Sequence, residues 1–151
     1  MTDQTSRLMA RALELAREAL ASGDHPYGSV IVGARAELGE LGERNRVVST
    51  TDPTAHSETM TVRAAARLWG LDGLAGSTLV TSYEPCPMCL GAILEAGVTR
   101  LVIGVRRPVG AAPLGDYTVE ALLGLLGRAE DLKVEAFPVT EELAAFYASV
   151  A

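Results

Sequence analysis

Residues 77–89, which read Ser-Thr-Leu-Val-Thr-Ser-Tyr-Glu-Pro-Cys-Pro-Met-Cys, decide the fold of this chain. The first five, from Ser77 to Thr81, are small, apolar or β-branched and predict a buried strand. The last five, from Pro85 to Cys89, predict the start of a helix over residues 86–96. A proline suits the first helical position, because its missing N–H has no partner to lose there. A strand therefore runs almost directly into a helix.

Strands and helices alternate in the rest of the 151-residue chain as well. Helical spacing of apolar residues predicts a first helix that ends at Gly23 and Asp24, and further helices over 55–68, 118–126 and 141–149. Short β-branched or apolar runs predict strands at 29–32, 101–105 and 132–136, and a Gly-containing turn leads from the first of them to an extended segment over 43–50. The alternation predicts a three-layer α/β fold. No repeat or linker marks a boundary, so we expect one domain over residues 1–151.

The composition limits the partners and the location of the chain. Hydrophobic residues make up 48% of it, which is enough for a core, and its formal net charge is −6 at pH 7. An acidic molecule repels phosphate backbones, and the densest basic spots are two short pairs, Arg44/Arg46 and Arg106/Arg107, which argues against a nucleic-acid partner. The sequence shows neither a signal peptide nor an apolar run of membrane-spanning length, so we expect a cytoplasmic protein without a membrane partner.

Cys86 and Cys89 are the only cysteines, and they lie three positions apart. At a helix start this spacing puts both sulfurs on one side of the first turn, and the helix N-terminus favours the thiolate that zinc requires. The two residues are too close in sequence to close a long loop by a disulfide. They form either a redox pair or part of a metal site, and we favour the metal site because another fitting ligand exists in the chain.

That ligand is His56, at the start of the helix predicted over 55–68. The only other histidine, His25, lies in a polar loop and is typical of a hydrogen-bonded structural residue. One imidazole and two thiolates give three protein ligands and leave the fourth tetrahedral position to water, as in catalytic zinc sites. The sequence therefore predicts a Zn²⁺ ion held by His56, Cys86 and Cys89.

Glu58 lies two residues after His56, close enough to reach the site without being a ligand. Alone it would be an ordinary first-turn carboxylate stabilised by the helix dipole. Beside the metal, it would take a proton from the zinc-bound water, hand it to a ring nitrogen and assist the departure of ammonia. We therefore predict Glu58 to be the catalytic acid and base of a hydrolytic deaminase.

His-x-Glu followed by Pro-Cys-x-x-Cys is the pattern of zinc-dependent nucleobase deaminases, in which the Glu is not a ligand. The wider stretches, DPTAHSE over 52–58 and YEPCPMC over 83–89, resemble the branch of the cytidine deaminase superfamily that holds bacterial guanine deaminases and tRNA adenosine deaminases. The resemblance runs from about residue 10 to residue 105. It implies a cytidine deaminase-like fold, with a five-stranded mixed central sheet flanked by helices.

The same resemblance implies roles for residues outside the two motifs. Asn45 matches an asparagine that hydrogen-bonds the heterocycle, although by itself it is also typical of a turn, and the backbone around Ala55 would touch the ring. The family dimerises through helices beside the sheet, which implies a homodimer. Ser57 departs from the family, whose members normally have alanine between the His and the Glu.

The residues after Val105 bear on the substrate. A tRNA adenosine deaminase would carry a short basic C-terminal segment, whereas residues 132–151 hold Lys133 against Glu135, Glu141 and Glu142. Guanine deaminases carry an acidic residue that faces the purine. Asp116 either matches this residue or is the N-cap of the helix at Thr118.

We therefore expect a small heterocyclic amine as the substrate, and a free purine-type nucleobase first, with guanine converted to xanthine and ammonia. Three alternatives remain. One is deamination of tRNA adenosine to inosine, and another is deamination of cytosine or an aminotriazine. The third is a non-catalytic zinc-binding domain, which needs a fourth protein ligand from His25 or a carboxylate.

Overall fold

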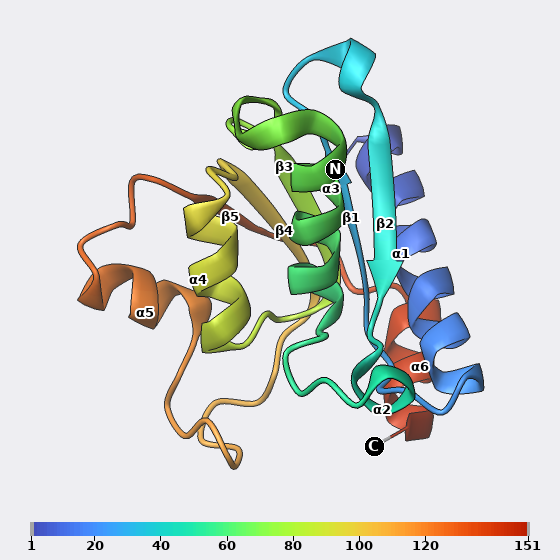
Figure 1. The fold of residues 1–151 in the computed structure, drawn as a ribbon. Coiled ribbons are helices and arrows are strands. Elements are labelled where there is room, and N and C mark those ends of the chain that lie inside the picture. The colour runs from blue at the N-terminus through green and yellow to red at the C-terminus, as the bar shows by residue number, and fades with distance from the viewer. Residues whose placement is uncertain (1, 151) are drawn as a thin grey trace.

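A five-stranded mixed sheet forms the centre of the computed structural model, which describes residues 2–150 (Figure 1). Its strands are β1 (Gly28–Val32), β2 (Glu40–Arg44), β3 (Thr78–Tyr83), β4 (Arg100–Val105) and β5 (Lys133–Ala136), in the order β2-β1-β3-β4-β5. β1 pairs antiparallel with β2 and β3, whereas β3, β4 and β5 run parallel. In the pairing of β1 with β3, Ser29 lies opposite Thr81.

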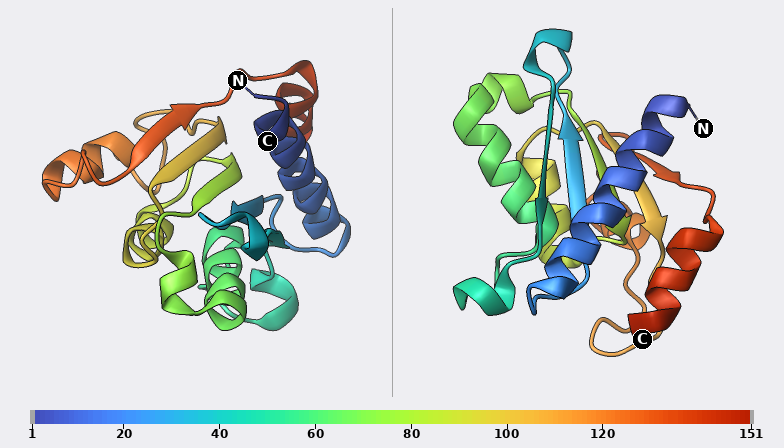
Figure 2. Two further views of the ribbon diagram at one scale, coloured as in Figure 1. Left: turned by 90° about the horizontal axis from the view of Figure 1, so that it is seen from above. Right: turned by 90° about the vertical axis from the view of Figure 1, so that its right-hand side faces the viewer.

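Helices cover both faces of this sheet (Figure 2). α1 (Asp3–Ala21) and α6 (Glu141–Val150) lie on one face, whereas α3 (Ser57–Leu74), α4 (Pro87–Glu95) and α5 (Val119–Leu125) lie on the other. A 3₁₀ turn (Ala36–Leu38) precedes β2, and the short α2 (Val47–Thr50) follows it. The predicted three-layer α/β fold with a five-stranded mixed sheet is thereby confirmed. None of the helices between residues 2 and 150 has the length and apolar character needed to cross a membrane.

The central strands supply side chains to two separate cores. In β4, Leu101 and Ile103 pack against α3, α4 and α5, whereas Val102 between them packs against α1 and α6. All three are at most 1% exposed. A strand that is buried on both faces has no polar face to show, which is why this segment is a continuous apolar run in the sequence.

The backbone of β1 comes very close to the backbone of α1 at Gly28, the first residue of the strand. A Cβ atom at Gly28 would lie 2.2 Å from the carbonyl oxygen of Ala12 and 2.7 Å from Cβ of Leu15. Only glycine leaves room for this approach. The contact fixes the chain beside Tyr27, which lines the cavity described below.

The extended segment predicted over 43–50 is wrong in its second half, because residues 47–50 form α2. Two side chains cause the turn. Asn45 Oδ1 accepts a hydrogen bond from the backbone N–H two residues later at 3.0 Å, and Asp24 Oδ1 accepts one from the Ser49 N–H at 2.8 Å. Side chains that bind backbone N–H groups compete with strand pairing, and Asp24 is remote in the sequence.

The helix predicted over 55–68 also has different ends. α3 starts at Ser57, because His56 keeps an extended conformation at the N-cap, with φ −71° and ψ 153°. At its other end the chain passes through Gly70, whose φ of 73° is not helical, and then adds a further turn up to Leu74. The apolar stripe used for the prediction does not continue through this kink.

Candidate active site

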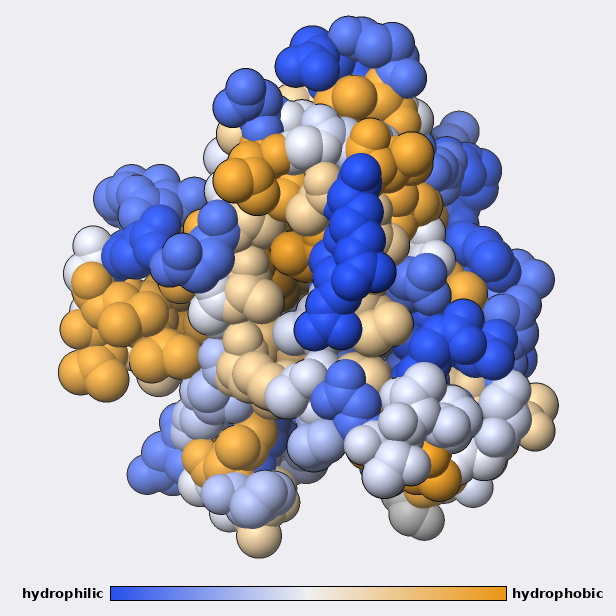
Figure 3. All heavy atoms as spheres, in the orientation of Figure 1, coloured by the Kyte–Doolittle hydropathy of each residue, from blue (hydrophilic) through white to orange (hydrophobic). Residues whose placement is uncertain are grey.

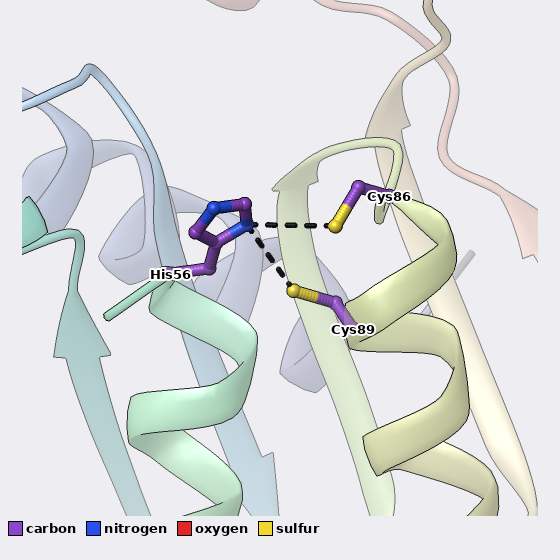
Figure 4. Close-up of side chains that lie close together, drawn as sticks. All are labelled: His56, Cys86 and Cys89. Carbon is purple, nitrogen blue, oxygen red and sulfur yellow. Dashed lines mark hydrogen bonds between the residues drawn. The ribbon is translucent and has the colours of Figure 1, made fainter. Parts of the chain in front are cut away.

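The three predicted metal ligands meet where β3 gives way to α4 (Figure 4). His56 is the N-cap of α3, Cys86 is the N-cap of α4, and Cys89 lies in the first turn of α4. His56 Nδ1 is 3.5 Å from Cys86 Sγ and 3.4 Å from Cys89 Sγ. All candidate ligand atoms lie within 4.8 Å of one another. The fold thus brings the histidine to the cysteines from a distant part of the sequence.

This geometry fits a zinc ion. Zinc–nitrogen bonds of about 2.0–2.1 Å and zinc–sulfur bonds of about 2.3 Å at a tetrahedral angle place nitrogen and sulfur about 3.6 Å apart, close to the distances seen here. Both cysteines are free thiols. Within residues 2–150 no further His, Cys, Asp or Glu joins the cluster, and this counts against a closed structural zinc site.

The imidazole and the thiols shift one another's pKa values. Hydrogen bonds from Cys89 and His56 hold the pKa of the Cys86 thiol well below its ordinary value, although burial opposes them. The pKa of Cys89 is raised, because this thiol keeps the proton that it shares with Cys86. The pKa of His56 is raised, first by its hydrogen bond with Cys86. The site therefore favours the thiolate form that a zinc ligand needs at Cys86, whereas Cys89 keeps its proton while no metal is bound.

Glu58 lies in the first turn of α3, beside the ligands but outside their cluster. The residue is only 6% exposed. Burial raises the pKa of its carboxyl group, and a hydrogen bond from the Ser57 hydroxyl at 2.5 Å opposes this rise. A raised carboxyl pKa suits a group that both takes and gives protons.

A cavity of about 170 Å³ lies beside these residues. Its lining consists of Tyr27, His56, Ser57, Glu58, Tyr83, Glu84 and Cys86. The rings of Tyr27 and Tyr83, with centroids 5.5 Å apart, give it an aromatic wall, and Tyr147 of α6 packs behind both. Pockets for drug-sized ligands measure about 300–1,000 Å³. The smaller cavity suits a single heterocycle.

The predicted substrate residues Asn45 and Ala55 lie next to each other but are not among the lining residues of this cavity. They are 2% and 1% exposed, and the backbone N–H of Arg46 donates to the Ala55 carbonyl oxygen at 3.0 Å. Asn45 Oδ1 is engaged by a backbone N–H, whereas its Nδ2 donates to none of the residues 2–150. The contact of Asn45 with a heterocycle stays a prediction.

Asp116 lies exposed in the loop between β4 and α5, and it does not line the cavity. The interpretation of Asp116 as the N-cap of α5 is wrong. Thr118 is the N-cap, and its Oγ1 accepts a hydrogen bond from the Ala121 N–H at 3.0 Å. The contact of Asp116 with a purine stays a prediction.

Arg107, which the sequence suggests to be part of a basic spot, instead organises this loop from within. The residue is 8% exposed, and its guanidinium group donates to the carbonyl oxygens of Gly115 at 3.3 Å, of Tyr117 at 3.2 Å, and of Ala111. The Tyr117 hydroxyl then donates to the Pro85 carbonyl oxygen at 2.6 Å, next to the first cysteine ligand. The loop is thereby tied to the candidate metal site.

Glu84 is a residue of the site that the sequence did not reveal, although it lies inside the YEPCPMC motif. It lines the cavity, and its carboxylate accepts hydrogen bonds from the N–H groups of Arg107 at 3.2 Å and Val119 at 3.0 Å. Arg106 pairs with Glu84 at 3.2 Å and with Glu120 at 2.7 Å. The guanidinium groups of Arg106 and Arg107 are therefore already bound to carboxylates and carbonyl oxygens of the protein itself.

Known proteins resemble the chain in sequence. The family model of the cytidine and deoxycytidylate deaminase zinc-binding region matches residues 2–105. A guanine deaminase from Bacillus subtilis is 44% identical over 89 residues, which are 58% of this chain and 56% of that protein. A tRNA-specific adenosine deaminase from Haemophilus influenzae is 43% identical over 99 residues, which are 65% of this chain and 56% of that protein.

A tRNA(Ile)-lysidine synthase from Deinococcus deserti is 43% identical over 110 residues, 73% of this chain but only 20% of that protein. The chain thus spans between a fifth and just over half the length of these curated relatives. Among solved structures, the guanine deaminase from Nitrosomonas europaea has a TM-score of 0.75 and 27% identity, over 94% of this chain and 81% of that one. The family model names a zinc-binding region of deaminases, and the relatives that are named as deaminases differ in substrate.

Proposed function

Because the chain belongs to the cytidine and deoxycytidylate deaminase zinc-binding family, we propose that it removes the amino group of a free purine-type nucleobase by hydrolysis. Guanine, which becomes xanthine and ammonia, is the first candidate. One observation carries this proposal: His56 and Cys86, two of the three clustered zinc-ligand residues, line one small cavity together with the buried Glu58.

His56, Cys86 and Cys89 would hold the zinc ion of this family, because one imidazole and two thiolates form the donor set of a catalytic zinc site. When bound there, zinc supplies a Lewis acid that lowers the pKa of water to about 7. Both ligand-bearing helices begin at the site, so small shifts of the loops nearby leave the ligands in place.

Glu58 would move the protons. Hydrolysis forms a carbon–oxygen bond at the ring carbon and breaks the bond from that carbon to the amino nitrogen. One proton of water must therefore reach the ring nitrogen, and another must reach the leaving amine. The carboxylate of Glu58 takes each proton in turn and delivers it, which its burial next to the cavity allows.

The ring would lie against Tyr27 and Tyr83, whose faces bury apolar area without fixing the identity of the base. We propose that Asn45 donates to the ring through Nδ2 and that the backbone near Ala55 contacts it, as in the family. Asp116 would reach the purine from its loop. In this proposal these three contacts determine substrate specificity, whereas the zinc ligands and Glu58 determine the type of reaction.

Charge favours a small molecule over tRNA. The net charge of −6 repels a phosphate backbone, and α6 begins with Glu141 and Glu142. Arg106 and Arg107 are engaged with carboxylates and carbonyl oxygens. The tRNA alternative is supported by the identity with the Haemophilus influenzae enzyme, so it belongs in the test.

A substrate panel tests the proposal. The zinc-loaded protein is incubated with guanine, adenine, cytosine, an aminotriazine and a tRNA anticodon stem-loop, and released ammonia is measured for each. We expect guanine to give the highest kcat/KM and the stem-loop to give none. Turnover of the stem-loop alone would overturn the proposal of a small-molecule substrate. Turnover of cytosine alone would overturn the proposal that the substrate is a purine base.

We also propose a homodimer. Apolar side chains gather over α5 (Figure 3), where Leu125 is 83% and Leu126 is 50% exposed, and α3 exposes Leu68 and Leu71. Contiguous apolar patches on a surface mark interaction sites. Light scattering should give twice the mass of the 15.8 kDa chain, and a Leu125→Glu variant should shift it toward the single mass. A monomeric wild-type protein would contradict this proposal.

A further inference from the structure

Behind Glu58 lies a chain of three buried hydroxyl groups, contributed by α3, β1 and β3. Ser57 and Ser29 are 0% exposed and Thr81 is 1% exposed. The Oγ atoms of Ser57 and Ser29 are 2.8 Å apart, and Ser29 Oγ lies 3.0 Å from Thr81 Oγ1. Thr81 Oγ1 in turn donates to the Tyr83 carbonyl oxygen at 3.2 Å. The chain therefore links α3 to the central strands of the sheet.

This chain ends on one particular oxygen of Glu58. Oε1 accepts a hydrogen bond from Ser57 Oγ at 2.5 Å, and Ser29 Oγ lies 3.5 Å from the same oxygen. Within residues 2–150 no side chain donates a hydrogen bond to Oε2, and Glu58 lines the cavity. The two carboxylate oxygens thus have different surroundings, and only Oε2 is left for a water molecule or a substrate.

A carboxylate without such a partner is not fixed, because its terminal torsion is broad and the two oxygens exchange by rotation. A hydroxyl that donates to a carboxylate makes one of the stronger hydrogen bonds in proteins. Ser57 is held by Ser29, and Ser29 lies opposite Thr81 in the sheet. The orientation of the carboxylate is therefore set by the rigid sheet as well as by its own helix.

We propose that Ser57 is a positioning residue, which holds Oε1 of Glu58 so that Oε2 alone exchanges protons in the cavity. Its catalytic consequence rests on the deamination proposed above. The contact itself can be measured without any substrate.

The kinetic arm compares Ser57→Ala with Thr61→Val. Alanine lacks only the hydroxyl oxygen of serine and adds no bulk to this buried position, so the variant is expected to fold. Thr61 is also on α3 and 0% exposed, but its Oγ1 donates to the Ser29 carbonyl oxygen at 3.3 Å and does not touch Glu58. We expect Ser57→Ala to lower kcat about tenfold with unchanged KM and zinc content. Thr61→Val should keep kcat within a factor of about two and change only stability.

The spectroscopic arm uses the metal-free protein. The infrared difference between wild type and Glu58→Gln isolates the carboxyl band of Glu58. We expect Ser57→Ala to shift this band and Thr61→Val to leave it in place. An unshifted band, or a shifted band with unchanged kcat, would overturn the positioning role. A wild-type protein that deaminates nothing would instead overturn the proposed function, while the band would still show whether the contact exists.

Discussion

Replacing Glu58 with glutamine is expected to lower kcat for deamination by about 10³-fold. The amide has nearly the same shape as the carboxylate, but it cannot take a proton from water or return one to the ring and the leaving amine. Because Glu58 lies outside the ligand cluster, bound zinc should stay at the wild-type level. Steady-state ammonia release and metal analysis of the same samples measure both quantities.

Glu120→Gln is the matched control for this variant. Glu120 is also a first-turn carboxylate, but it belongs to α5 and pairs with Arg106 at 2.7 Å. Its removal should leave kcat within a factor of about two, since it contacts neither the ligands nor the cavity. A Glu58→Gln protein that holds zinc and releases ammonia at the wild-type rate would disprove the assigned role.

Replacing His56 with alanine should abolish zinc binding and activity together. Two thiolates alone give an incomplete ligand set, and binding to the folded state is what stabilises a metalloprotein. With zinc at a hundredfold excess over the wild-type dissociation constant, the free energy of unfolding should fall by about 3 kcal/mol relative to wild type. Metal analysis and urea unfolding, with and without a chelator, measure the loss.

His25→Ala provides the comparison, because His25 is the only other histidine and lies outside the ligand cluster. This variant should keep its zinc, and the chelator should destabilise it as much as wild type. Equal zinc contents in the His56 and His25 variants would mean that the ion is held elsewhere.

The order of helices and strands was predictable because it depends on local patterns. Buried strands such as β4 are continuous apolar runs, and the helices have apolar residues at helical spacing. The prediction failed over 47–50, where Asp24 turns a β-branched segment into α2 from 25 residues away. A contact of that kind has no trace in the local pattern.

The metal ligands could be predicted because their chemistry is rare and their spacing is characteristic. The surroundings of Glu58 could not, since Ser29 meets Ser57 across 28 residues and Thr81 across 52. Serines and threonines occur throughout proteins, and nothing in the sequence indicates which of them meet. The sequence indicates only that Ser57 replaces the alanine expected from the resemblance, and it does not indicate which groups Ser57 contacts.

Arg107 shows how this molecule can be re-engineered. Its guanidinium group contacts the loop before α5 through backbone carbonyl oxygens alone, so these three contacts do not depend on the side chains at residues 111, 115 and 117. Gly110 and Gly115 have positive φ values of 86° and 56° and need to stay. Leu114 and Asp116 have no positive φ, so a combinatorial library at these two positions is expected to leave the course of the loop unchanged.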